Sequence, residues 1–226
     1  MKVPTGLTKE EQNYIVRSDY IVRFKKLFSF LLSTAGKEQQ YSLLELGCRT
    51  GMLIKFLEAN GLSNIKCYGV DIEPNFLKNA ALLGMTVKEC DLNWEKIPFD
   101  NDKFDYIVSF ELLEHIPFYH KHLSEIKRIL RNNGKLLLTT PNIAKLGNRF
   151  SFLMGVDIHR VYSLNQKDVH YRMFTMNSII KLFMLHGFNI AKKSYLISTK
   201  SKGIFLPLKH IIPSCGDIIF CVGVKK

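Results

Sequence analysis

The stretch Ser42-Leu43-Leu44-Glu45-Leu46-Gly47-Cys48-Arg49-Thr50-Gly51 decides the fold. Its apolar start predicts a strand over 42–46, and its two glycines bound a loop. Apolar residues then recur at three- and four-residue spacing, which predicts a helix over 52–60. Strand, glycine loop and helix form the first unit of a doubly wound nucleotide-binding sheet, because glycine lets the backbone turn sharply close to a ligand. The stretch therefore predicts an α/β fold.

A second apolar run, 65–70, ends at Asp71, where a carboxylate can accept two hydrogen bonds from ribose hydroxyls. A dinucleotide fingerprint would need a glycine where Arg49 stands, and a phosphate-binding P-loop would need a lysine after Gly51. The carboxylate of Glu45 would repel phosphate and suits the ammonium group of an amino acid instead. A ligand with a ribose at one end and an amino acid at the other is S-adenosylmethionine, so the two acids predict this cofactor.

With these features the sequence resembles the class I S-adenosylmethionine-dependent methyltransferases over residues 40–142. Four motifs carry the resemblance in the order that the family has them: 45–51, Asp71-Ile72, Asp91-Leu92 and 104–115. The resemblance implies a doubly wound, mostly parallel seven-stranded sheet (a Rossmann-like methyltransferase fold) whose last strand is inserted antiparallel. It also implies a set of cofactor-binding residues, namely Glu45, Gly47, Cys48, Arg49, Thr50, Gly51, Asp71, Ile72, Asp91, Leu92, Phe110 and Glu111.

Hydrophobic periodicity and turn residues predict the remaining elements. The predicted strands are 42–46, 65–70, 86–90, 106–110 and 135–140, with a final antiparallel pair over 188–194 and 215–224. The predicted helices are 8–33, 52–60, 76–83, 119–131 and one between Thr175 and Gly187. We expect one domain over 1–226, with the first helix lying across the cofactor cleft as a lid. The irregular segment 143–174 should cover the carboxyl ends of the strands, where open α/β sheets bind ligands.

Bulk composition is that of an ordinary globular protein. The 226 residues are 46% hydrophobic and 23% charged, and no apolar run approaches the roughly 20 residues that span a bilayer. The polar start of the chain predicts no secretion signal. Five cysteines form no Cys-x-x-Cys pair, which indicates neither a disulfide framework nor a zinc site. We therefore expect a cytoplasmic protein.

Positive charge gathers in the last third of the chain. The formal net charge is +12, and from Lys145 onward thirteen Lys and Arg residues face only three Asp residues. A basic face can attract nucleic acid, an anionic membrane or a phosphorylated substrate. It can equally be a solvated surface, because these lysines stand singly or in pairs rather than in a dense tract.

Candidate catalytic and substrate-binding residues follow the fourth motif and fill the segment 143–174. Methyl transfer to a hydroxyl or an acidic carbon needs a proton removed, and histidine titrates near neutral pH. His115 is the first candidate base and His170 the second. The candidates for binding an acceptor or its anionic group are Arg149, His159, Arg160, Tyr171 and Arg172. Asp91 and Glu111 supply only part of a metal-binding set, so we predict no metal.

Three functional hypotheses remain open from the sequence. The leading one is methyl transfer to oxygen or carbon of a small acceptor, with an anionic or glycan-linked acceptor as one option; the loose resemblance of 141–188 to a small-molecule and sugar branch of the family supports it. Methylation of exocyclic amines on DNA is disfavoured, because the motif for that chemistry is absent after strand 106–110. The alternatives are an RNA methyltransferase that uses the basic C-terminal third, and a non-catalytic cofactor-binding partner protein. The oligomeric state stays open.

Overall fold

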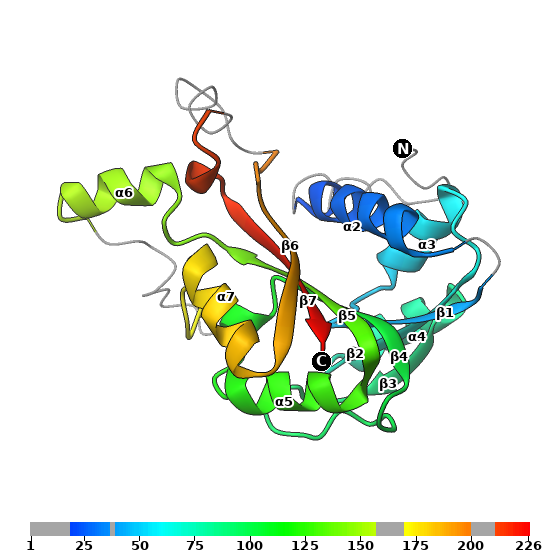
Figure 1. The fold of residues 1–226 in the computed structure, drawn as a ribbon. Helices are drawn as coiled ribbons and strands as arrows, with labels where there is room; N and C mark the ends of the chain where they lie inside the picture. The colour runs from blue at the N-terminus through cyan, green and yellow to red at the C-terminus, as the bar shows by residue number, and fades with distance from the viewer. Residues whose placement is uncertain (1–18, 37–38, 157–169, 200–210) are drawn as a thin grey trace.

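The computed structural model describes residues 19–36, 39–156, 170–199 and 211–226. Its centre is a seven-stranded sheet in the order β3-β2-β1-β4-β5-β7-β6 (Figure 1). The strands are β1 (Tyr41–Leu46), β2 (Ile65–Asp71), β3 (Thr86–Glu89), β4 (Phe104–Phe110), β5 (Leu130–Pro141), β6 (Phe188–Leu196) and β7 (Ile218–Lys225). The first five pair in parallel, whereas β7 runs antiparallel to both β5 and β6. The doubly wound sheet and its inserted antiparallel strand are thus confirmed.

Helices cover both faces of the sheet, which therefore has two apolar layers. One layer is formed by α2 (Tyr20–Thr34), α3 (Met52–Ala59) and α4 (Pro74–Leu82), and the other by α5 (Tyr119–Ile129) and α7 (Met176–Leu185). Strand β4 shows why: Tyr106 and Val108 pack into the first layer, and Ile107 between them packs into the second. Alternate residues of a strand point to opposite faces, so a strand covered on both sides is apolar throughout.

The two loop glycines have different surroundings, although both have positive φ. Gly51 precedes α3 at φ +75°, and a Cβ there would lie 2.9 Å from the Cα and Cβ of Ala80 in α4. Gly47, at φ +69°, would place a Cβ no closer than 3.6 Å, to a side-chain carbon of Leu112. Both glycines were predicted to bind the cofactor, and that role stays a prediction. The structure shows that Gly51 also permits close packing of α3 on α4.

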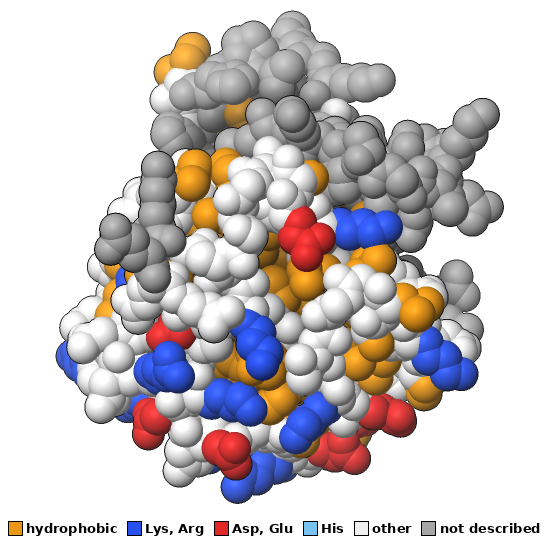
Figure 2. Space-filling view, turned by 90° about the vertical axis from the view of Figure 1, so that its right-hand side faces the viewer, with side chains coloured by type: hydrophobic (Ala, Val, Ile, Leu, Met, Phe, Trp, Pro, Cys, Tyr) orange, Lys and Arg blue, Asp and Glu red, His pale blue; other side chains and the backbone are white. Residues whose placement is uncertain are grey.

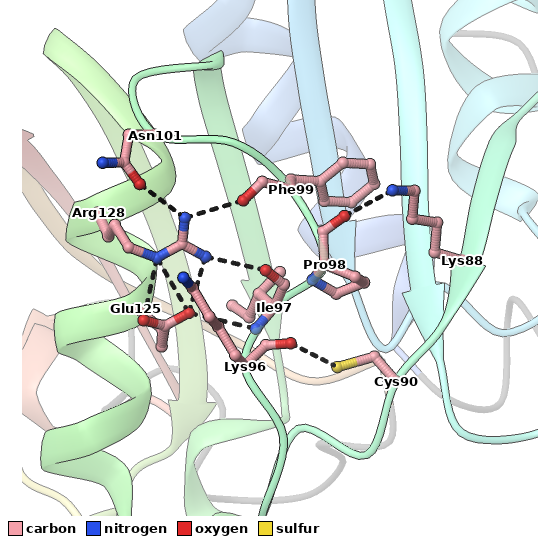
Figure 3. Close-up of polar contacts among 9 residues, drawn as sticks. All are labelled: Lys88, Cys90, Lys96, Ile97, Pro98, Phe99, Asn101, Glu125 and Arg128. Carbon is pink, nitrogen blue, oxygen red and sulfur yellow. Dashed lines mark hydrogen bonds and ion pairs between the residues drawn. The ribbon is translucent and has the colours of Figure 1, made fainter.

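Arg128 of α5 holds the link between β3 and β4 in place (Figure 3). Its guanidinium donates to the backbone oxygens of Phe99 (2.8 Å) and Ile97 (2.9 Å), and to the carboxylate of Glu125 at 2.8–3.2 Å. The Glu125 carboxylate also accepts a hydrogen bond from the backbone amide of Ile97, at 3.2 Å. This network fixes a turn-rich segment whose beginning, at Asp91, lies at the edge of the sheet where ligands bind.

Several predicted element boundaries were wrong. Helix α5 ends at Ile129 rather than at 131, because Leu130 already pairs with Phe104 of β4. Asn133, with φ 62°, does not end the helix but lies inside β5, where the register between β4 and β5 shifts. The last strand begins at Ile218, and a 3₁₀ helix, η3 (Pro213–Cys215), precedes it. The segment expected to be irregular contains helix α6 (Leu146–Leu153), which extends away from the sheet in Figure 1.

The predicted 8–33 helix is described only from Asp19 onward, and its first part lies outside the described residues. Helix α2 packs firmly on the body, with Phe24, Leu27 and Leu31 buried. Its start is tied to the distant β6 end, since the Asp19 carboxylate accepts hydrogen bonds from the amide and hydroxyl of Thr199.

Charge is mixed on the face of the molecule that Figure 2 shows. Figure 2 views the molecule from the right-hand side of Figure 1, and Lys, Arg, Asp and Glu side chains are interspersed over its lower half. Among the described residues, no helix combines the length and apolar character that crossing a bilayer requires.

Candidate active site

A cleft of about 350 Å³ opens where β1, β2 and β4 end. Parallel strands present their carboxyl ends at one edge, and β1 lies between β2 and β4, so the cleft sits where the chain order of the strands reverses. Of the residues predicted to bind the cofactor, the cleft is lined by Gly47, Arg49, Asp71, Ile72, Asp91, Leu92, Phe110 and Glu111. The other lining residues are Tyr20, Leu46, Cys90, Asn93, Leu112, His115 and Ile116.

Asp71 connects the glycine loop to the end of β2. One carboxylate oxygen accepts from the Arg49 amide at 2.8 Å and the other from the Glu73 amide at 3.1 Å. Arg49 itself has φ +47°, and its guanidinium lies over the Phe76 ring, 4.7 Å from the centroid. Each carboxylate oxygen has two acceptor sites, so Asp71 keeps capacity for ribose hydroxyls while it orders the loop.

Glu45 lies behind the loop, next to a small cavity of about 10 Å³ that Cys48 and Thr50 also line. It is buried, and its Oε2 has no hydrogen-bond partner among the described residues. Burial, and then the neighbouring Asp71 carboxylate, raise the pKa of Glu45 well above its ordinary value. The nearby Arg23 guanidinium opposes this rise, and the ammonium group of an amino-acid ligand would oppose it further. Cys48 and Thr50, which were predicted to bind the cofactor, line this small cavity and not the cleft.

Helix α2 reaches the cleft through its first turns rather than lying over it along its length. Tyr20 lines the cleft, and the Arg23 guanidinium lies 4.6 Å from the Tyr20 ring centroid. Arg23 is buried, and its Nη1 lies 3.5 Å from a carboxylate oxygen of Glu111. Glu111 has φ +50° directly after β4, a conformation that a side chain other than glycine adopts at a cost of about 1–3 kcal/mol. Strain of this kind is common in ligand-binding loops.

A second cavity, of about 250 Å³, lies beside the cleft at the end of β5. Its lining residues are Glu114, Thr140, Pro141, Asn142, Ile143, Lys145, Asn148, His170, Arg172 and Met173. Two predicted residues, His170 and Arg172, are therefore at this cavity. Arg149 is not among its lining residues, and donates to backbone oxygens of Ala144 (2.6 Å) and Ser214 (3.2 Å) instead.

Other candidates from the segment 143–174 do not reach the described cavities. Tyr171 is exposed and lines neither one. His159 and Arg160 lie outside the described residues. The cavity wall instead depends on Asn142, which the sequence analysis did not select: its side-chain amide donates to Ser214 (3.0 Å) and Gly216 (2.8 Å), and its carbonyl accepts from the Ala144 amide.

The cleft and the cavity meet at a histidine pair. His115 lines the cleft and His170 lines the cavity, and their ring centroids are 4.8 Å apart at 86°. Beneath them lies Glu114, whose Oε2 accepts from the Thr140 hydroxyl at 3.0 Å. Burial and then the neighbouring Glu111 carboxylate raise the pKa of Glu114 to about 8. Glu114 was not among the site residues predicted from the sequence, although it stands beside His115 in the fourth motif.

The sheet, its switch point and the acid at the end of β2 define the chain as a doubly wound nucleotide-cofactor-binding protein. A family model described as a methyltransferase domain matches residues 17–193. The chain therefore belongs to this family, the S-adenosylmethionine-dependent class I methyltransferases, and S-adenosylmethionine is its cofactor. The residues fit that cofactor: the buried carboxylate of Asp71 lines the cleft, and Glu45, beside the glycine loop, has a buried oxygen without a hydrogen-bond partner among the described residues.

Solved structures share the fold at low sequence identity. A structure from Thermotoga maritima, described as a possible histamine N-methyltransferase, has a TM-score of 0.65 and 16% identity, covering 96% of this chain and 95% of that one. The magnesium protoporphyrin IX methyltransferase of Synechocystis, solved with bound S-adenosylhomocysteine, has a TM-score of 0.63 and 15% identity, covering 97% and 89% of the two chains. These similarities confirm the architecture.

Curated relatives align with only part of the chain. A Methanocaldococcus jannaschii protein of unassigned function is 31% identical over 114 residues, which is 50% of this chain and 47% of that protein. The malonyl-[acyl-carrier protein] O-methyltransferase of a Paenibacillus strain is 25% identical over 115 residues, 48% and 41% of the two chains. The chain thus spans about half the length of these relatives or less.

Proposed function

We propose that this protein transfers a methyl group from S-adenosylmethionine to an oxygen or carbon atom of a small acceptor. The observation that carries the proposal is the meeting of the cofactor cleft and the second cavity at His115 and His170. A group-transfer enzyme needs two adjoining binding sites, one for the donor and one for the acceptor. The cleft is the donor site of the proposal, and the cavity that Glu114, Asn142 and Arg172 line is its acceptor site.

The chain's own residues account for binding of the cofactor. Asp71 would accept hydrogen bonds from the ribose, Asp91 and Leu92 would meet the adenine, and Glu45 would balance the ammonium charge behind the glycine loop. When bound, S-adenosylmethionine supplies an electrophilic methyl group on a sulfonium. The cleft lining carries the three carboxylates of Asp71, Asp91 and Glu111 against the one guanidinium of Arg49, and this acidic balance favours a cationic ligand over a phosphate.

The histidine pair stands where an acceptor proton has to leave. An acceptor in the second cavity would approach the cleft past His170 and His115, and a neutral imidazole at either position can accept a proton from a hydroxyl or an acidic carbon. Burial of Glu114 and Thr140 under this junction keeps water from its lower side. The residues of the junction therefore exclude water, orient the acceptor and move its proton.

The acceptor cavity favours a small molecule with an anionic group. Lys145 and Arg172 are the two cationic side chains among its described lining residues, and Ile143, Met173 and Pro141 supply apolar surface. The name of the Paenibacillus relative reports O-methylation of a malonyl group, which is also an anionic acceptor. We favour oxygen as the methylated atom for this reason.

Asp71 provides the test of the cofactor site. Replacing Asp71 by Ala removes two expected charge-assisted hydrogen bonds to ribose, and we expect S-adenosylmethionine to bind about 3 kcal/mol, or roughly 100-fold, more weakly by calorimetry. Asp100→Ala, which removes an exposed acid, is the matched control and should bind normally. An unchanged dissociation constant in Asp71→Ala would place the cofactor elsewhere.

Turnover is tested separately. The protein should release S-adenosylhomocysteine when S-adenosylmethionine is supplied with a metabolite extract, and dicarboxylate or other anionic acceptors should be enriched among the methylated products. Binding of the cofactor without turnover in any acceptor pool would favour the non-catalytic partner protein instead. Turnover only with added RNA, lost on replacing Lys192 and Lys193, would favour the RNA methyltransferase.

A further inference from the structure

Three potential metal ligands converge at the junction of the two cavities. One ligand atom from each of Glu114, His115 and His170 lies within 4.8 Å of the others. Glu114 and His115 belong to the 3₁₀ helix η1 (Leu113–His115), which follows β4, whereas His170 lies near the end of segment 143–174. The tertiary structure therefore assembles the cluster from two distant parts of the chain.

The carboxylate of Glu114 is buried without enough partners. Glu114 is 1% exposed, and its Oε1 has no hydrogen-bond partner among the described residues. The other oxygen is held by the Thr140 hydroxyl at 3.0 Å. An unsatisfied buried carboxylate oxygen is costly, and a cation beside it removes that cost. Thr140 would then orient the ligating carboxylate, as outer-sphere hydrogen bonds do at known metal sites.

We propose that Glu114, His115 and His170 bind a divalent first-row transition-metal ion that faces the acceptor cavity. Two imidazoles and one carboxylate are the donor set of catalytic zinc and of mononuclear iron(II) sites, and three protein ligands leave positions open for an acceptor. Mg²⁺ and Ca²⁺ prefer oxygen donors, so two imidazoles select against them.

The spacing of the ligand atoms suits such an ion after side-chain adjustment. Ligands at about 2.0–2.2 Å from a tetrahedral metal ion lie roughly 3.3–3.6 Å apart. The cluster, with ligand atoms up to 4.8 Å apart, has to contract by as much as about 1.2–1.5 Å, which side-chain rotation can supply. The prediction that the protein binds no metal rested on Asp91 and Glu111, which line the cofactor cleft, and not on these three residues.

The role of the ion rests on the proposed methyl transfer, whereas its binding does not. An ion open to the acceptor cavity would lower the pKa of an acceptor hydroxyl, so that oxygen would attack without a separate strong base. With an ion bound, both imidazoles serve as ligands. Without one, they remain candidate bases. Metal dependence of turnover therefore separates the two roles of the histidine pair.

Cobalt(II) is a suitable probe because its visible absorption reports nitrogen and oxygen ligands. The full chain is treated with a chelator, which is then removed, and titrated with Co²⁺ alone, with stoichiometry from elemental analysis. We expect one bound ion with absorption bands of low-coordinate Co²⁺, displaced by Zn²⁺. Glu114→Gln and His170→Ala should each weaken binding at least about 100-fold, because even outer-sphere changes at metal sites cost 10–100-fold.

His120→Ala is the matched control. His120 and His186 form a second pair of neighbouring imidazoles, with Nδ1 and Nε2 2.8 Å apart, on the surface between α5 and α7. The control variant should bind Co²⁺ as the wild-type chain does. Absence of Co²⁺ binding in the wild-type chain, or binding that survives His170→Ala and disappears in His120→Ala, would overturn the proposal.

Cofactor binding keeps the two proposals distinguishable. His170→Ala should keep its circular dichroism spectrum and its affinity for S-adenosylmethionine, because His170 lies outside the cleft. Asp71→Ala should lose S-adenosylmethionine and still bind Co²⁺. A chain that binds the cofactor but not Co²⁺ refutes only the metal site.

Discussion

Gly51→Ala should destabilise the protein mainly through helix packing, although Gly51 belongs to the cofactor motif. At φ +75° an alanine is strained by about 1 kcal/mol, and its Cβ would stand 2.9 Å from the Cα and Cβ of Ala80. One of these contacts is backbone, so α3 and α4 must separate, and overpacking of this kind costs about 1–3 kcal/mol. We therefore expect a loss of about 2–4 kcal/mol in the free energy of unfolding.

Gly61→Ala isolates the strain from the contact. Gly61 has φ +82°, and a Cβ there would meet nothing within 4 Å, so its alanine variant should lose only about 1 kcal/mol. Replacing glycine by alanine lowers the conformational entropy of the unfolded chain equally in both variants. This entropy change therefore cancels when the two free energies of unfolding are compared. The excess of Gly51→Ala over Gly61→Ala, about 1–3 kcal/mol, is thus the packing cost.

Urea unfolding followed by circular dichroism measures both variants under one set of conditions. Calorimetry with S-adenosylmethionine on folded Gly51→Ala should show nearly normal affinity, because Gly51 does not line the cleft among the described residues. Equal destabilisation of the two variants would refute the packing explanation. Loss of cofactor binding from a fully folded Gly51→Ala protein would restore the ligand-approach role that the sequence indicated.

Three further predictions concern the scaffold of the site. Burial lowers the pKa of His122 from 6.5 to about 4, so between pH 6.5 and pH 4 the unfolded chain binds a proton that the folded chain does not. The free energy of unfolding should therefore fall by about 3 kcal/mol as the pH drops through this range. His122→Leu should flatten this part of the pH dependence of the free energy of unfolding. Arg128→Lys should lose about 2–3 kcal/mol in urea unfolding, because an ammonium group cannot replace the guanidinium donors to Ile97 and Phe99; an unaltered midpoint would contradict this account. Asp19→Ala should lower the melting temperature by releasing Thr199 from the start of α2, whereas Asp100→Ala should leave it unchanged.

Elements whose signals are local could be predicted from sequence. Strand β2 and the acid at its end follow from one apolar run and one carboxylate, and Pro74 marks the first residue of α4 because its fixed φ suits a helix start. Helix α6 was missed for an equally local reason. Prediction of a helix relies on apolar residues that repeat on one buried face. In α6 the apolar residues Phe152 and Leu153 are exposed, so this helix lacks that pattern.

The sequence by itself determined the doubly wound sheet, the cofactor class and about half of the residues that line the cofactor cleft, because parallel strands bring their carboxyl ends to one edge whatever the details of packing. Only the tertiary structure decided which neighbours these residues have. It set Gly51 against Ala80, and it brought His170 to Glu114 and His115 across more than fifty residues of chain. Such contacts depend on strand register and the path of connecting segments, which periodicity within one segment does not encode.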